Sequence, residues 1–217
     1  MNVSPAKSVK VPRQSRDPEA TQAEILNAAE QEFAKQGFMA AKTEAIAAQT
    51  GVTKAMIYYY FASKEGLYKA MLERAFTKHL QPLEKFDFAQ LSPEEALATF
   101  LREVLQQLSR NLNLATILFL EALQNKGKFY PQETGELLYG TLQRILERGI
   151  EEGCFRTLDP RHTAVNIMGT CVFYFSATDN LKFLWKGKRL LSKDMLQQHT
   201  QEAINLVLAG VRSTTEA

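Results

Sequence analysis

Cysteine is scarce in this sequence, and long apolar runs are missing. The two cysteines among the 217 residues, Cys154 and Cys171, lack the spacing of a metal site, which favours free thiols in a reduced compartment. One disulfide between them is the alternative. No run reaches the roughly 18 apolar residues of a membrane span, and residues 1–20 lack the apolar segment of a secretory signal. We therefore expect a cytoplasmic protein without membrane contact.

Motifs of enzyme catalysis are also missing. The sequence has no G-x-S-x-G, no glycine-rich phosphate loop and no H-E-x-x-H. The three histidines, His79, His162 and His199, fall on separate predicted helices. A catalytic pair assembled in space stays open, but no feature of the sequence favours one. We predict that the chain is not an enzyme and that it has no catalytic residues, no metal site and no cofactor.

Charge of the two signs is nearly balanced, with a formal net charge of +2, so composition alone does not indicate a nucleic-acid partner. The basic excess lies near the N-terminus, where residues 1–78 contain 11 Lys and Arg against 8 Asp and Glu. Residues 1–16 hold Lys7, Lys10, Arg13 and Arg16 without any acid, and we interpret them as a flexible basic arm. Such an arm is either a solvated tail or a segment that follows a phosphate backbone or a minor groove.

The first predicted helix has a recognisable start and end. Asp17-Pro18-Glu19 supplies an N-cap, a proline at the first helical position and an acid in the first turn, while Thr21 begins a competing capping box. Gly37 is predicted to end the helix, with Phe38 folded back onto Phe33.

Helix signals continue along the chain, and no convincing alternation of period two indicates a strand. Two short helices are predicted next, over residues 41–50 and from Thr53 to about Tyr60. Longer helices follow from Ser63 to about Leu80, and over 93–110, 114–124, 131–153, 160–185 and 193–211. The expected fold class is all-α, with a three-helix N-terminal helix-turn-helix domain followed by a larger helical bundle.

The stretch TGVTKAMIYYYF, residues 50–61, places three consecutive tyrosines on a helix too short to bury them all. Because successive helical residues lie about 100° apart, Ile57, Tyr60 and Phe61 share the side that anchors the helix. Half-buried packing is the ordinary alternative for any of these tyrosines. The outside is then predicted to carry Lys54, Ala55, Met56, Tyr58 and Tyr59.

This outer face has the chemistry of a helix that reads DNA. A short helix that follows another across a tight turn is the helix-turn-helix layout, whose second helix enters the major groove. Lys54 can donate to guanine, and Ala55 and Met56 can contact a thymine methyl group. The hydroxyls of Tyr58 and Tyr59 can donate to phosphates. Helix N-termini beside this face add Lys42, Thr43 and Lys64, although Lys64 alone can equally be a solvated cap residue.

Residues 21–72 resemble the DNA-binding region of the TetR family of bacterial transcription regulators. The resemblance is carried by ILNAAEQEFAKQGF (25–38), TEAIAAQTGVTKAMIYYYF (43–61) and SKEGLYKAML (63–72), in matching order and spacing. The longer helices beyond are similar to the family's ligand-binding region without a specific motif. The resemblance implies a ligand-responsive regulator, usually a repressor, in which residues 17–66 bind double-stranded DNA and residues 67–217 bind the ligand and dimerise.

The resemblance also assigns roles within the DNA-binding region. It makes Lys42 and Thr43 the start of the helix that braces against phosphate. It makes Thr53, Lys54, Ala55 and Met56 the entry of the recognition helix, with Tyr58, Tyr59 and Lys64 as contacts to the DNA backbone.

Three positions depart from the family pattern or are ambiguous. Lys42 stands where the family often has Ser or Thr, which would replace a neutral phosphate contact with an ionic one. Tyr60 stands where a histidine is common, so no contact is carried over to it. Glu44 lies near the expected DNA surface, where it either accepts from cytosine N4 or points to solvent, and we favour solvent.

The resemblance further implies a homodimer joined by a four-helix interface, formed by residues 161–185 and 193–211 of each subunit. Two-fold symmetry would place two recognition helices about one DNA turn apart, which predicts a palindromic operator. The last predicted helix has a broad apolar surface that suits a partner, and packing within one subunit is the alternative.

A pocket for an unidentified small-molecule effector is implied inside the bundle. Arg144, Glu147 and Arg148 are interpreted as a solvated helix face, so no fixed charge indicates a charged ligand. The competing function is a helical small-molecule-binding protein, or an enzyme, without operator binding. The candidate lining residues, for each of which plain core packing is the alternative, are Phe119, Cys171, Phe173, Tyr174 and Trp185.

Overall fold

The computed structural model describes residues 17–213, apart from the side chains of His79, Leu80, Gln81 and Thr134. The predicted basic arm, residues 1–16, lies outside this range. The described chain is helical, with one isolated β-bridge between Phe155 and Arg212 and no strand, so the all-α prediction is confirmed. Its helices are α1 (Pro18–Ala40), α2 (Thr43–Thr50), α3 (Lys54–Phe61), α4 (Lys64–Glu84), η1 (Phe88–Gln90), α5 (Pro93–Arg110), α6 (Leu112–Asn125), α7 (Gln132–Glu151), α8 (Pro160–Ser176), α9 (Thr178–Leu181) and α10 (Lys193–Val211).

Three helices begin with a capping residue whose side chain accepts from the first turn. The Asp17 carboxylate accepts from the backbone N–H of Glu19 at 3.0 Å, so Asp17 and not Thr21 caps α1. Ser92 and Glu95 form a reciprocal capping box at the start of α5. Thr53 caps α3 by accepting from the backbone N–H of Met56 at 3.2 Å.

Gly37 ends the regular part of α1, as predicted. Its φ of 71° lies in the left-handed region, which a side chain would make costly. The chain turns there and brings the ring of Phe38 back over the ring of Phe33, with centroids 6.2 Å apart. Phe38 then packs against Tyr68 and Phe129, at 5.0 and 4.9 Å, in an aromatic cluster between α1, α4 and the segment after α6.

The prediction of one helix over residues 160–185 is wrong. α8 ends at Ser176, α9 covers only Thr178–Leu181, and Trp185 lies in a turn beyond it. The hydroxyls of Ser176 and Thr178 donate to carbonyls of the preceding turn, those of Val172, Tyr174 and Phe175. Such side-chain bonds compete with helix propagation, which gives a physical reason for the break.

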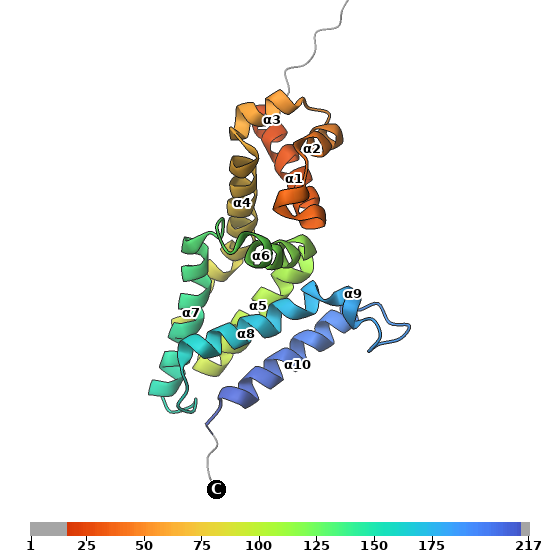
Figure 1. The fold of residues 1–217 in the computed structure, drawn as a ribbon. Helices are drawn as coiled ribbons and strands as arrows, with labels where there is room; N and C mark the ends of the chain where they lie inside the picture. The colour runs from red at the N-terminus through yellow and green to blue at the C-terminus, as the bar shows by residue number, and fades with distance from the viewer. Residues whose placement is uncertain (1–16, 214–217) are drawn as a thin grey trace, which may run out of the picture.

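Two hydrophobic cores lie at the two ends of the molecule. One joins α1–α3 to the first half of α4, and the other joins α5, α7, α8 and α10. Figure 1 shows α4 running from the small end toward the large one, with α6 between them. Leu114 and Ile117 of α6 and the following Phe129 belong to the smaller core, so α6 packs against the small N-terminal half as well as the bundle.

Candidate DNA-binding surface and effector cavity

Helix α3 is anchored on one side only. Ile57 is fully buried, and Tyr60 and Phe61 are half-buried against the smaller core, as the helical spacing predicts. Lys54 and Ala55 are exposed, and Tyr59 is 83% exposed. α3 lies at the far end of the small half, where no other described helix covers its outer face (Figure 1). The helix therefore presents a polar and aromatic face to an outside partner.

Two members of the predicted outer face are less free. Tyr58 is 37% exposed, and its hydroxyl pairs with the hydroxyl of Thr43 at 3.3 Å. Met56 is half-buried and packs against the smaller core. Both residues therefore lie at the edge of the exposed face, between α3 and its neighbours.

A polar network links α2 to α3 across this face. The ammonium of Lys54 lies 2.5 Å from a carboxylate oxygen of Glu44, and the Thr43 hydroxyl donates to the other oxygen at 3.3 Å. This hydrogen bond between Lys54 and Glu44 lowers the pKa of Glu44 and raises the pKa of Lys54. Glu44 points to solvent as expected, with 61% of its side chain exposed, and it pairs with Lys54 at the same time. It holds Lys54 in place through a side-chain pair that local sequence periodicity does not reveal.

The flanking residues are also partly engaged. Thr43 is only 4% exposed, so its hydroxyl serves the network between α2 and α3. Lys42 is exposed at the start of α2. Lys64 is half-buried: its ammonium donates to the backbone carbonyl of Met39 at 3.1 Å and lies 5.1 Å from the ring centre of Phe38. Lys42 is therefore exposed beside Glu32, whose carboxylate accepts from the Lys42 backbone N–H at 3.1 Å, whereas Lys64 is tied to the end of α1.

We expect Glu44→Gln to raise the affinity for any DNA duplex about three- to tenfold at low salt, because the change removes a negative charge beside the phosphates. Fluorescence anisotropy with a random-sequence duplex at several salt concentrations measures this. Glu73→Gln, an exposed position on α4, is the matched control. An affinity for the random-sequence duplex that stays unchanged or falls would contradict the prediction.

A large apolar cavity of about 750 Å³ lies between α4, α6, α7 and α8. This volume is within the usual range of small-molecule sites. Phe76 of α4 lines this cavity, so the helix that directly follows α3 in the chain forms part of the cavity wall. Its lining residues are Phe76, Leu118, Phe119, Glu121, Ala122, Leu123, Lys126, Gly127, Tyr130, Leu138, Tyr139, Val165, Met168, Gly169 and Val172.

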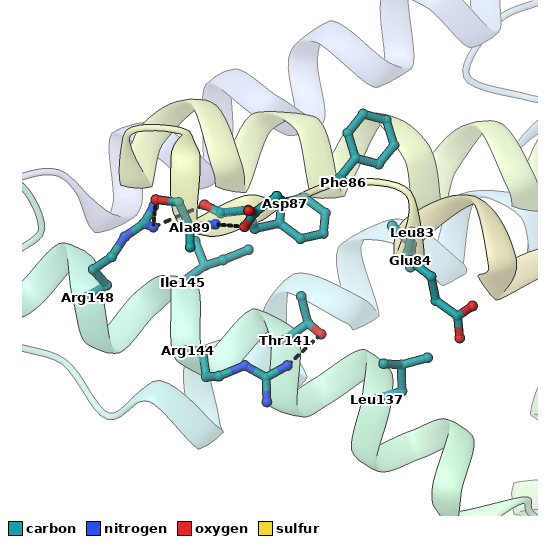
Figure 2. A pocket seen from close by; sticks show the side chains of 11 residues that line it. Leu83, Glu84, Phe86, Asp87, Ala89, Leu137, Thr141, Arg144, Ile145 and Arg148 are labelled. Carbon is teal, nitrogen blue, oxygen red and sulfur yellow. Dashed lines mark hydrogen bonds between the residues drawn. The ribbon is translucent and has the colours of Figure 1, made fainter.

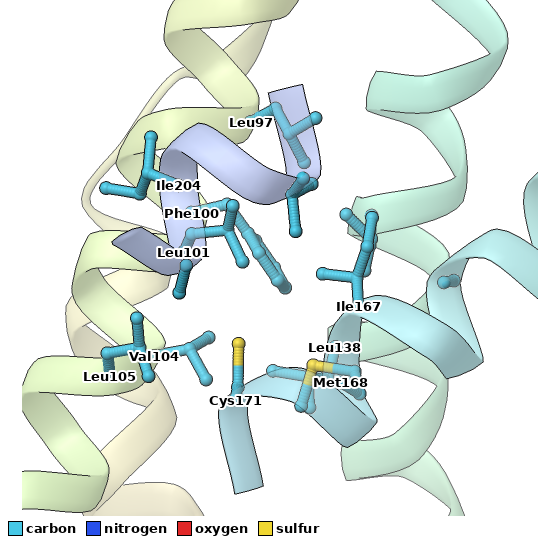
Figure 3. Packing of buried hydrophobic residues seen from close by; sticks show 14 of the residues in the cluster. Leu97, Phe100, Leu101, Val104, Leu105, Leu138, Ile167, Met168, Cys171 and Ile204 are labelled. Carbon is cyan, nitrogen blue, oxygen red and sulfur yellow. The ribbon is translucent and has the colours of Figure 1, made fainter. Parts of the chain in front are cut away.

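Of the residues predicted to line an effector pocket, only Phe119 lines this cavity. Cys171 is fully buried in the larger core, beside Leu101 and Met168 (Figure 3). Tyr174 is buried too, and its hydroxyl donates to the carbonyl of Leu190 at 2.7 Å.

The other two predicted lining residues also lie elsewhere. Phe173 is 54% exposed on α8, and Trp185 packs against the larger core from the turn after α9. The sequence favours a cavity lined by aromatic residues of α8 and beyond, but it does not show which face of each helix its neighbours cover.

Arg148 is not part of a solvated helix face. Its guanidinium donates to the backbone carbonyls of Phe88, Ala89 and Leu91, at 3.0, 3.0 and 2.6 Å. Figure 2 shows this side chain reaching from α7 to the segment between α4 and α5. A second cavity of about 400 Å³ lies there, with Arg144 on its α7 wall. Arg148 therefore fixes the connection that follows α4.

Glu121 of α6 is a buried acid that the sequence-based prediction missed. It is 1% exposed and accepts from the Tyr68 hydroxyl at 3.0 Å, the Asn125 amide at 2.5 Å and the backbone N–H of Phe129 at 2.6 Å. Burial, together with the Glu121 carboxylate, raises the pKa of Tyr68. Because Glu121 also lines the large cavity, it connects that cavity to α4. A lone acid within the apolar run LATILFLEAL is the signal that could have identified it.

Helices α8 and α10 carry exposed apolar side chains, although they lie beside each other in the larger half (Figure 1). Val165 and Phe173 on α8 are 59% and 54% exposed, and Leu206 on α10 is 66% exposed. Val165 lines the large cavity, whereas Phe173 and Leu206 are exposed large apolar side chains outside its lining.

Two findings concern other kinds of site. Nowhere in residues 17–213, with the four undescribed side chains set aside, do three or more His, Cys, Asp or Glu residues group as a metal site would require. No helix in that same range has the length and apolarity to cross a membrane.

Comparison with known proteins gives matches along most of the chain. Residues 25–71 match the bacterial regulatory proteins of the tetR family, and residues 93–207 match a tetracyclin repressor-like C-terminal domain. The HTH-type transcriptional regulator RutR of Escherichia coli is 29% identical over 205 residues, which are 92% of this chain and 94% of that protein. The HTH-type transcriptional repressor NicS of Pseudomonas putida is 32% identical over 162 residues, 72% of this chain and 76% of that protein.

A solved structure with the same arrangement of helices is the transcriptional regulator FadR from Bacillus subtilis in complex with stearoyl-CoA. It superposes with a TM-score of 0.68 at 23% identity, over 88% of this chain and 99% of that chain. At this identity the similarity establishes the fold alone.

Proposed function

The chain belongs to the tetR family of bacterial regulatory proteins, and we propose that it acts as a homodimeric repressor of a palindromic operator, released by a small molecule. As a member of this family it is a ligand-responsive, DNA-binding transcriptional regulator and not an enzyme. We further propose that it works in the cytoplasm. Residues 17–66 would bind DNA and residues 67–217 would bind the effector and dimerise, with α4 linking the two.

The observation that carries the proposal is the outer face of α3, exposed at Lys54, Ala55 and Tyr59 and anchored by the buried Ile57. Placed in the major groove, Lys54 would donate to guanine, and Ala55 with the half-buried Met56 would contact a thymine methyl group. The remaining proposed contacts, to phosphates or through the cap of α3, are Lys42, Thr43, Thr53, Tyr58, Tyr59 and Lys64.

Dimerisation would pair α8 and α10 with the same helices of a second copy. The exposed side chains of Phe173 and Leu206 would be buried in this interface. Two-fold symmetry would then set two α3 helices about one DNA turn apart, which corresponds to a palindromic operator.

The large apolar cavity is the proposed effector site. Of the five lining residues predicted from the sequence, this site keeps only Phe119. A ligand there would contact Phe76 of α4 directly and would lie against Glu121, which is hydrogen-bonded to Tyr68 of the same helix. Because α4 follows α3 in the chain, a shift of α4 would change the spacing of the two reading helices and lower the affinity for the operator.

We expect Leu206→Glu to weaken dimerisation at least about 100-fold, because the symmetry places the buried charge in the interface twice. Sedimentation velocity over a range of concentrations measures the change. Met39→Glu, an equally exposed position on α1, is the control and should leave the dimer intact. A Leu206→Glu variant that remains dimeric at the lowest concentrations would place the interface elsewhere.

The experiment that tests the proposed function is operator binding. Duplexes from the DNA beside the gene are titrated with the protein, and we expect one inverted repeat to bind far more tightly than its scrambled sequence, with an affinity that falls steeply as salt rises. Equal binding to the repeat and to the scrambled duplex would contradict the proposal.

A further inference from the structure

One buried polar group in the larger half has no role in the packing described so far. Gln107 of α5 is only 7% exposed, and its amide nitrogen has no hydrogen-bond partner in residues 17–213. Its neighbours on the helix stripe are Val104 and Leu108. An unpaired buried amide destabilises a fold, so nearly all such groups in native proteins have a partner. A ligand that supplies an acceptor would satisfy this one.

Gln107 lines a small inner cavity of about 50 Å³. This inner cavity meets the large cavity, because five side chains line both: Phe76, Leu118, Leu138, Met168 and Val172. The two cavities are therefore adjacent, and these shared apolar side chains lie between the outer cavity and the inner one beside Gln107. The space is large enough for a water molecule, which an incoming ligand atom would displace.

The chemistry of the inner cavity limits what can reach its end. Besides Gln107, its walls are entirely apolar: Phe76, Leu83, Val104, Leu108, Leu114, Leu118, Leu138, Met168 and Val172. A charged group there would lose its hydration and would gain only one amide, which is strongly unfavourable. An uncharged oxygen would lose much less and would gain a hydrogen bond. The outer mouth differs, because Lys126 and the half-buried Tyr130 and Tyr139 line it.

We propose that Gln107 recognises the effector, and that the effector is an elongated, largely apolar molecule whose inner end carries an uncharged carbonyl or hydroxyl oxygen. This inference rests on the proposed effector-binding function and specifies its ligand class. The amide of Gln107 donates to that oxygen, and the apolar body of the ligand occupies the adjacent large cavity up to its outer mouth. Polar or charged groups of the ligand remain at the mouth.

The position of the inner cavity also connects ligand recognition to α3, because α4, which follows α3 in the chain, lines this cavity. Phe76 and Leu83 both belong to α4 and both line the inner cavity. A ligand long enough to reach Gln107 passes between these side chains and α5, so it contacts α4 along two turns. Of the side chains of α4, shorter molecules that stop in the outer cavity contact only Phe76. A ligand that occupies the inner cavity therefore contacts more of α4 than a ligand that stops in the outer cavity.

The test uses decan-2-one as the neutral probe and decanoate as the charged one, titrated calorimetrically into the full-length protein. We expect decan-2-one to bind the wild type and to bind Gln107→Leu about tenfold more weakly, because one buried hydrogen bond is lost. Decanoate, whose carboxylate stays at the mouth, should bind both proteins equally. Gln106→Leu, the adjacent and exposed position, should bind both probes as the wild type does.

Thermal unfolding followed by circular dichroism accompanies each titration, and Gln107→Met serves as a second variant if the leucine variant folds poorly. Unchanged decan-2-one affinity in the Gln107 variants, or no binding by the wild type up to the solubility limit, would overturn the proposal. An equal loss of decanoate affinity would overturn the uncharged inner end. Operator binding by the same wild-type preparation separates these failures from a failure of the proposed function.

Discussion

Replacing Lys54 and Tyr58 together with alanine is expected to lower the affinity for the operator at least about 100-fold, since each lost contact to a base or phosphate costs on the order of 1–3 kcal/mol. The change removes the cation that Glu44 positions on α3 and the hydroxyl that pairs with Thr43. Ile57, which anchors α3, is untouched. Fluorescence anisotropy with the operator duplex measures the loss.

The control for this double variant is Arg102→Ala, which removes one exposed positive charge from α5 in the larger half. We expect it to bind the operator as the wild type does. Circular dichroism and sedimentation should show that the double variant keeps its helices and its oligomeric state. If the double variant binds the operator as tightly as the wild type, α3 is not the recognition helix.

Glu121→Ala is expected to lower the free energy of unfolding by about 3 kcal/mol, because it leaves several buried donors without an acceptor, each costing about 1–3 kcal/mol, while recovering the desolvation cost of the carboxylate. The donors are the Tyr68 hydroxyl, the Asn125 amide and the backbone N–H of Phe129. These groups join α4 to α6, so we expect the loss of stability to come from a weaker contact between the two halves. Urea unfolding measures the change.

Two comparisons make this prediction specific. Tyr68→Phe removes one hydroxyl and should cost about 1 kcal/mol. Glu133→Ala, an exposed acid in the first turn of α7, should change stability by less than about 0.5 kcal/mol. A Glu121→Ala variant as stable as the wild type would show that the buried carboxylate does not hold the halves together.

Local periodicity separated the buried from the most exposed residues of α3, although it placed the half-buried Met56 on the outer face. A step of about 100° per residue separates Ile57, which is buried, from Tyr59, which is exposed, without any knowledge of the neighbours. Capping signals likewise identified Asp17 as the start of the first helix. These features depend on residues within one or two turns of each other, and such information is contained in a short stretch of sequence.

Contacts between distant segments could not be predicted in the same way. The pair of Glu44 with Lys54 spans ten residues and two helices, and the hydrogen bond of Tyr68 to Glu121 spans 53. Periodicity shows that Gln107 falls in an apolar stripe of α5, but it does not show that two cavities meet there. The lining of the proposed effector cavity comes from four helices and the segment after α6, so its composition depends on how these elements pack.

Selection from a pool of random duplexes, carried out in parallel with the wild type and the Lys54→Ala/Tyr58→Ala variant, tests whether the outer face of α3 recognises the operator. We expect the wild type to enrich an inverted repeat whose half-sites lie about 10 bp apart, centre to centre, and the variant to enrich no sequence. Enrichment of the same repeat by both proteins would contradict recognition through the outer face of α3.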